Sequence, residues 1–225
     1  MKSPPGEIEN KSKQLARLES FSDGVFAIAI TLLILELIEM LHSSGRAELG
    51  KLLLAHWKSF LVFLIGFLTI LVCWINHHLV LSFAEKTDGN FFWVNGFVLL
   101  VVTFTPFPTA ILAEYLEKES HLALAIFGFN YFMMSIAAYC ITVYINNRLT
   151  SHEKNELLHC YVLLYRWSII YTLIVFFVCL IAVPLAIALY VLLFVVFAFP
   201  KEFASKLMAM RNKRKRRSSR RMTAG

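Results

Sequence analysis

The residues best suited to chemistry lie within or beside long apolar segments. Ser22 and Asp23 stand in the first segment, His77 and His78 in the second, and Asn95 in the third. A serine, a carboxylate and an imidazole are the groups of a hydrolase triad, and paired histidines can hold a metal or a haem. Polar side chains in apolar helices also bond across to neighbouring helices. The sequence must therefore be tested for a catalytic site, a metal or haem site, and a structural network.

Neither chemical interpretation has a motif to support it. The sequence contains no G-x-S-x-G nucleophile elbow and no H-E-x-x-H metal motif. Helix-spaced ligand pairs on several segments, as a haem would need, are also missing. The four cysteines are widely spaced and read as small apolar fillers: Cys73, Cys140, Cys160 and Cys179. We expect no enzyme activity, no cofactor and no bound metal.

The composition is that of a membrane protein. Hydrophobic residues make up 58% of the 225 residues and charged residues 16%, and the mean hydropathy is +0.65. A soluble domain of this length is much less apolar. Long apolar segments that recur along the chain therefore point to an all-α protein that crosses a bilayer several times.

Five apolar segments set the expected organisation. About 20 apolar residues cross a bilayer, and segments of this kind run over 21–41, 56–83, 91–115, 122–145 and 167–199. The last is too long for one helix, and proline should divide it near Val183 and Pro184; one kinked, tilted span is the alternative. Six transmembrane helices result. The loop over 146–166 has room for a surface helix. We divide the chain into an N-terminal segment (1–20), a six-helix domain (21–200) and a basic tail (201–225).

Positive charge sets the orientation. Eight Lys and Arg residues and no acid lie between Arg211 and Arg221, so the net charge of +7 belongs to the tail. A tail of this kind behind a final apolar helix contacts anionic lipid headgroups or holds the orientation, and we do not expect it to bind nucleic acid. With both tails inside, 18 of the 22 Lys and Arg are cytoplasmic. The first segment lacks a cleavage site, so we expect it to stay in the mature protein.

Ser22 and Asp23 have two interpretations. Both residue types cap helix N-termini, so they can mark where the first helix begins. The topology also places Asp23, the histidine pair and Asn95 at a similar depth, which favours a network between the first three helices. Both interpretations remain open at this point.

Three stretches of the sequence resemble a known family. Arg17-x-x-x-Phe21-Ser22-Asp23, Trp74-x-x-His77-His78, and the stretch from Asn95 to Pro106-Phe-Pro108-Thr109 are similar to the signatures of endolysosomal potassium channels and their bacterial relatives. The animal proteins carry two six-helix repeats per chain, whereas this chain carries one. The resemblance therefore implies a bacterial homotetramer in the inner membrane that conducts potassium as a leak, and the sequence has no TVGYG-like filter.

The resemblance also implies which residues line the pore. In the family, positions five, eight and twelve after the motif aspartate form apolar constrictions around a hydroxyl layer, and here these are Ile28, Thr31 and Leu35. Their spacing of three and four places them on one helix face. Glu39 returns to the same face and would form an acidic ring at the outer mouth, or is an ordinary interfacial glutamate.

The remaining polar residues are expected to hold the bundle together without touching the ion. This structural polar network comprises Arg17, Phe21, Ser22, Asp23, Trp74, His77, His78 and Asn95. A secondary transporter or a small membrane-embedded binding protein is the alternative function. Transporters usually have inverted repeats and interrupted helices, whereas we expect the first helix of this chain to be unbroken.

Overall fold

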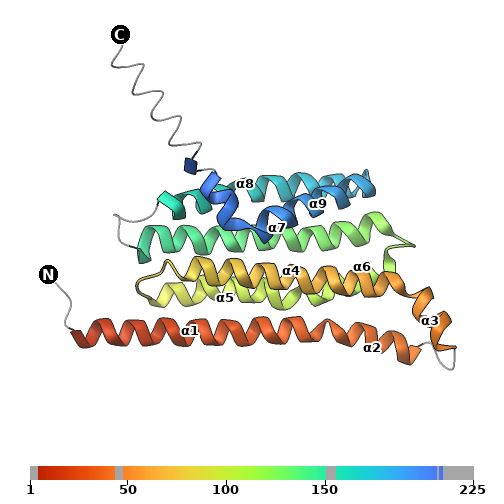
Figure 1. Cartoon of the computed structure of the whole chain (residues 1–225), viewed down its shortest axis with the longest axis horizontal. Helices are drawn as coiled ribbons and strands as arrows, with labels where there is room; N and C mark the ends of the chain where they lie inside the picture. Colours follow the sequence, from red (N-terminus) through yellow and green to blue (C-terminus); the bar gives the residue numbers. More distant parts are fainter. Residues whose placement is uncertain (1–4, 44–47, 151–155, 207, 210–225) are drawn as a thin grey trace, which may run out of the picture.

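A computed structural model describes residues 5–43, 48–150, 156–206 and 208–209, which form a helical bundle (Figure 1). The helices in chain order are α1 (Pro5–Leu32), α2 (Ile34–Ser43), α3 (Leu49–Ala55), α4 (Trp57–Leu81), α5 (Gly89–Phe104), α6 (Pro106–Tyr115), α7 (Ser120–Tyr144), the π-helical turn η1 (Ile145–Leu149), α8 (Glu156–Cys179) and α9 (Val183–Ala198). The all-α prediction is confirmed.

Five segments are long and apolar enough to cross a membrane: Lys13–Glu39, Trp57–Leu81, Gly89–Tyr115, Ser120–Leu149 and Leu157–Cys179. Helix α9 and the short helix Pro200–Lys206 would make a sixth, but they are bent by 83° at the residue between them. The protein is therefore a multi-pass membrane protein with five such spans in its described residues, or six if the bent pair is counted as one span.

The segments run back and forth along one long axis (Figure 1). The start of α1, the connection from α4 to α5 and the end of α7 lie at one end of the bundle. Helix α3 and the connections α6–α7 and α8–α9 lie at the other end. Helices α1 and α2 form one edge, and α8 and α9 lie on the opposite side of the bundle. The pairing of short connections with antiparallel neighbours is as expected for such a bundle.

The first helix begins earlier than the sequence suggests. Helix α1 starts at Pro5, so Ser22 and Asp23 lie in its interior and the interpretation of them as N-caps is wrong. The hydroxyl of Ser22 donates to the carbonyl oxygen of Leu18, four residues back in the same helix, at 2.8 Å. A serine satisfied in this way does not need to stand at a helix end.

The fifth helix also begins earlier. Most of the stretch 146–166 was expected to be a loop, but α8 begins at Glu156. Leu158, Cys160, Tyr161 and Tyr165 are all at most 2% exposed. These residues recur at helical spacing, so the face they form is buried against the bundle even though polar residues between them lower the local hydropathy.

Two prolines interrupt the chain. The helix expected over 91–115 is divided at Thr105, directly before Pro106 begins α6. The predicted division near Val183 is confirmed, because α8 ends at Cys179 and α9 begins at Val183 with Pro184 in its first turn. Proline is tolerated in a first helical turn, where its missing N–H has no partner to lose.

Candidate functional site on the first helix

A buried chain of hydrogen bonds links α1, α5 and α4. The side-chain amide of Asn95 donates to Ser22 Oγ at 2.9 Å, and its oxygen lies 2.8 Å from His77 Nε2. Ser22 already uses its hydrogen on Leu18 O, so it must accept from Asn95. The amide oxygen of Asn95 therefore faces His77, whose Nε2 carries the proton and donates. The three side chains are buried.

Two further contacts run from α1 to α4 beside this chain. The indole Nε1 of Trp74 donates to Asp23 Oδ1 at 2.8 Å. His78 Nδ1 lies 2.9 Å from Glu19 Oε1, in a partly exposed ion pair. The ring of Phe26 packs on His77 with centroids 5.3 Å apart. These contacts hold the face of α1 that carries Ser22 and Asp23 to α4 and α5.

This arrangement does not have the geometry of a hydrolase or a metal site. Ser22 pairs with an amide and a backbone carbonyl rather than with an imidazole, so no base is placed to remove its proton. Asp23 pairs with an indole rather than orienting a histidine. Within the described residues, no group of three or more His, Cys, Asp or Glu side chains is placed to hold a metal ion.

Two residues of the predicted network lie apart from it. Arg17 is exposed, and the part of the chain that the structure describes gives it no hydrogen bond or ion pair. Phe21 is 63% exposed. Both point away from the face that carries Ser22. Their role as network members stays a prediction, and any partner for them lies outside the described residues of one chain.

The three predicted pore residues share one exposed face of the first span. Ile28 and Leu35 are 59% and 54% exposed, and Thr31 between them is also exposed. The hydroxyl of Thr31 donates to Ile28 O at 2.9 Å. Its hydrogen is therefore directed along the helix, which leaves the oxygen lone pairs available on the outer side. Glu39 is exposed and lies on α2, near the far end of the span.

The first span is one segment, Lys13–Glu39, as expected, but its helical hydrogen bonding is interrupted at one residue. A single residue, Leu33, separates α1 from α2, and its N–H reaches the carbonyl oxygen of Ile30 at 3.4 Å. Leu33 itself is 1% exposed. The interruption therefore lies on the packed side, and Ile28 and Thr31 belong to α1 whereas Leu35 belongs to α2.

Sequence reasoning missed a second polar centre, between α4, α8 and α9. The amide nitrogen of Asn76 donates to Phe197 O, in the last turn of α9, and to Val72 O, both at 2.8 Å. Tyr165 OH donates to Asn76 Oδ1 at 2.9 Å, and the Tyr165 ring stacks on that of Phe197. The only sequence signal was an asparagine within an apolar helix. Its partner on α9 is a backbone carbonyl, and a sequence motif cannot show a backbone partner.

Comparison with known proteins decides the family. A family model described as "Endosomal/lysosomal potassium channel TMEM175" matches residues 17–106, which include the first two motifs and the third as far as Pro106. The crystal structure of a lysosomal potassium-selective channel TMEM175 homolog from Chamaesiphon minutus matches this chain with a TM-score of 0.71 and 36% sequence identity. The match covers 84% of this chain and 98% of that one. The chain belongs to the TMEM175 family.

Two relatives are named potassium channels. One, from Chamaesiphon minutus, is 47% identical over 120 residues, and one from Streptomyces collinus is 44% identical over 123 residues. The aligned segments cover 52% and 54% of this chain, and 59% of each of the two relatives. The resemblance drawn from the motifs is confirmed. None of these TMEM175 relatives is named as an enzyme, so the comparisons argue against the hydrolase interpretation.

Proposed function

We propose that this protein is a potassium-selective leak channel assembled from four chains around a central axis, in a bacterial inner membrane with both termini in the cytoplasm. Family membership and the names of the relatives support the channel function. The observation that carries the mechanism is the exposed face of Ile28, Thr31 and Leu35 on a span whose opposite face is fixed to α4 and α5. One chain has a single copy of this face, so a closed pore requires several chains.

The proposed pore has two kinds of layer. Rings of Ile28 and Leu35 would be apolar constrictions that resist wetting, and the Thr31 ring between them would offer hydroxyl oxygens. Each Thr31 hydrogen is already bonded to Ile28 O, so the oxygen presents lone pairs to a cation. Potassium sheds its water more easily than sodium, and partial replacement of that water therefore favours potassium. Because only one oxygen layer is available, the expected selectivity is modest.

Charged residues at the two ends complete the proposal. Four copies of Glu39 would form an acidic ring at the outer mouth, where it would raise the local concentration of cations. The basic residues 211–221 lie outside the described residues, and we assign them to the cytoplasmic lipid surface. Both assignments follow from the proposed topology, so an experiment that tests the topology also tests them.

The test is a flux measurement on purified protein in liposomes. A channel should pass potassium down its own gradient with no other ion gradient present, and Ile28→Asn should wet the constriction and increase this flux several-fold. Ile28→Leu keeps the ring apolar and is the matched control, with flux near that of the unmodified protein. Flux that appears only with a sodium or proton gradient would instead support a secondary transporter, the alternative function.

A further inference from the structure

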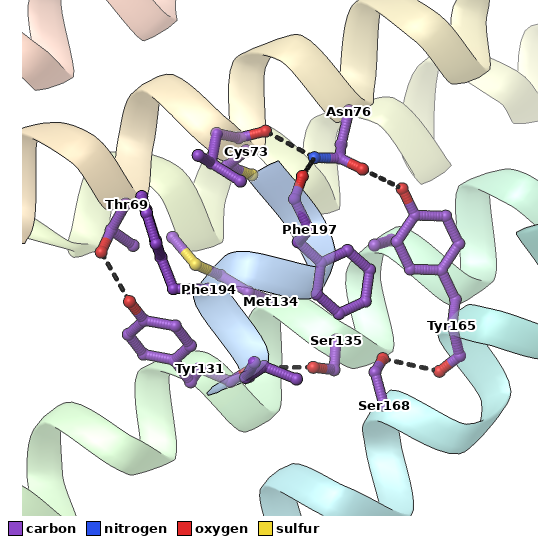
Figure 2. Close-up of a pocket in the computed structure, with 13 residues that line it drawn as sticks. Thr69, Cys73, Asn76, Tyr131, Met134, Ser135, Tyr165, Ser168, Phe194 and Phe197 are labelled. Atoms are coloured by element: carbon purple, nitrogen blue, oxygen red, sulfur yellow. Dashed lines mark hydrogen bonds between the residues drawn. The ribbon is translucent and has the colours of Figure 1, made fainter. Parts of the chain in front are cut away.

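A cavity that is partly open to the outside of the bundle lies away from the first span. It has a volume of about 80 Å³ and lies between α4, α7, α8 and α9 (Figure 2). The side chains that define it include Cys73 and Asn76 of α4, Met134 of α7, Ser168 of α8, and Phe194 and Phe197 of α9. Cys73 lies deep among protein atoms and still has solvent-accessible surface, because that surface faces the cavity.

The polar groups in the wall already have partners. Asn76 uses both amide hydrogens on backbone carbonyls and accepts from Tyr165. Tyr131 OH pairs with Thr69 Oγ1 at 2.6 Å. The Ser135 and Ser168 hydroxyls donate to backbone oxygens one turn away (Figure 2). A water molecule needs two to four polar partners, and these wall groups offer it hydroxyl lone pairs but no unused O–H or N–H donor.

The space is larger than a water site and its wall is polarisable. A single buried water needs only about 10–15 Å³ by this measure, and an engineered apolar cavity of about 150 Å³ stays dry and takes benzene or xenon. The sulfur atoms of Cys73 and Met134 and the rings of Phe194 and Phe197 make favourable contacts with aromatic or polarisable groups. A lipid acyl chain is too long for this space.

We propose that this cavity is a binding site for a small, uncharged, polarisable molecule, no larger than a single aromatic ring, that dissolves in the bilayer. The site belongs to each chain separately and does not depend on the pore or on the proposed channel function. A smaller cavity of about 30 Å³ shares Cys73, Asn76 and Met134 with it, and extends the apolar space toward His77. A ligand in the larger cavity would therefore sit close to the α4 residues that hold α1.

Crystals of the assembled protein pressurised with xenon test this proposal directly. The expected result is one xenon peak per chain in the anomalous map, within contact distance of Cys73 Sγ and Met134 Sδ, and benzene soaked into separate crystals should occupy the same place. Ala138 lines both cavities, so Ala138→Leu should fill the space and abolish the peak. Ala55→Leu makes the same change at an exposed position on α3 and should leave the peak intact.

Two outcomes would overturn the proposal. One is ordered water in the cavity of the unmodified protein. The other is xenon bound at different apolar sites, which would show that the crystals were loaded, with this cavity empty. Both outcomes are read from the unmodified protein, so the proposal stays testable even if Ala138→Leu does not fold.

Discussion

The helices within the two halves of the bundle are held together by different kinds of contact. In the first half, α1 to α6, polar side chains bond to one another: Asn95 to Ser22 and His77, and Trp74 to Asp23. In the second half, α7 to α9, some polar side chains also pair with one another, such as Thr172 with Ser135, but several contacts between helices end on backbone carbonyls. Tyr171 OH donates to Leu189 O, and His121 Nδ1 lies 2.9 Å from Cys179 O at the end of α8.

This difference explains where the sequence signal lies. A bond between two side chains requires two particular residue types at fixed positions, whereas a backbone carbonyl is supplied by any residue. The family model matches 17–106, which is almost the whole of the first half. In the second half, the sequence signal consists of hydropathy, of residues that pack between helices, and of a few polar residues. The cavity lies where α4 of the first half meets the helices of the second half.

The largest expected loss of stability comes from a substitution at a close helix contact in the second half. A Cβ atom added to Gly128 of α7 would lie 2.0 Å from Tyr190 Oη and 3.1 Å from its Cζ. Tyr190 is buried and its ring lies against Tyr131, so it has little room to move. Gly128→Ala should lower the free energy of unfolding by about 3 kcal/mol, measured by thermal or denaturant unfolding in detergent.

Two controls sharpen this comparison. At Gly66 of α4, the nearest atoms to an added Cβ are ends of side chains, Thr109 Cγ2 at 2.8 Å and Leu33 Cδ2 at 3.2 Å, so Gly66→Ala should cost less. Gly128→Ala combined with Tyr190→Phe should recover part of the loss, since the hydroxyl is gone. Equal losses for Gly128→Ala with and without Tyr190→Phe would show that this contact does not limit the packing.

Substitutions of Asn76 and Asn95 should lower stability by different amounts. Asn76→Leu leaves Tyr165 OH and Phe197 O without their partner, and it should lower the free energy of unfolding by about 2 kcal/mol. Asn95→Leu leaves only the Nε2–H of His77, because Ser22 keeps its bond to Leu18, and should cost about 1 kcal/mol. Hydrogen exchange checks the location: faster exchange is expected in α9 for the first variant and in α1 for the second. The reverse pattern would contradict the bonds that tie Asn76 to α9 and Asn95 to α1.

The smallest effect is expected at the surface, where Lys58 donates to Glu117 Oε1. This hydrogen bond and the nearby positive charge lower the pKa of Glu117. The stabilisation is therefore present above the usual glutamate pKa, about 4.3, and is lost as the pH falls through the lower value of the folded state. Lys58→Met should change stability slightly at neutral pH and low salt, with no difference in acid or high salt. A difference that persists in high salt would mean that Lys58 acts through packing.

Much of the fold could be predicted from the sequence because hydropathy and proline act locally. The spans of α4 and α7 lie within two residues of their predicted ends, and the division before Pro184 follows from the chemistry of proline. The starts of α1 and α8 could not be predicted. At α8 the deciding factor is burial of Tyr161 and Tyr165 against other helices, and at α1 it is the satisfaction of Ser22 inside the helix.

The candidate site was also predictable from the sequence only in part. Residue types and topology were enough to group Ser22, Asp23, Trp74, His77 and Asn95, which the structure brings into contact. The pairing of His78 with Glu19 and of Asn76 with a backbone carbonyl depends on which helix faces which, and hydropathy does not contain that information. The ionic role of Ile28, Thr31 and Leu35 stays a prediction.

The reversal potential under a potassium and sodium gradient tests the central proposal most directly. Thr31→Val removes the only hydroxyl layer proposed for the pore, so the reversal potential should move toward the value of an unselective pore while current persists. Thr103→Val is the matched control, because Thr103 is also an exposed threonine bonded to carbonyls of its own helix, and it should keep the original value. An unchanged reversal potential for an assembled Thr31→Val channel would show that the first span does not select the ion.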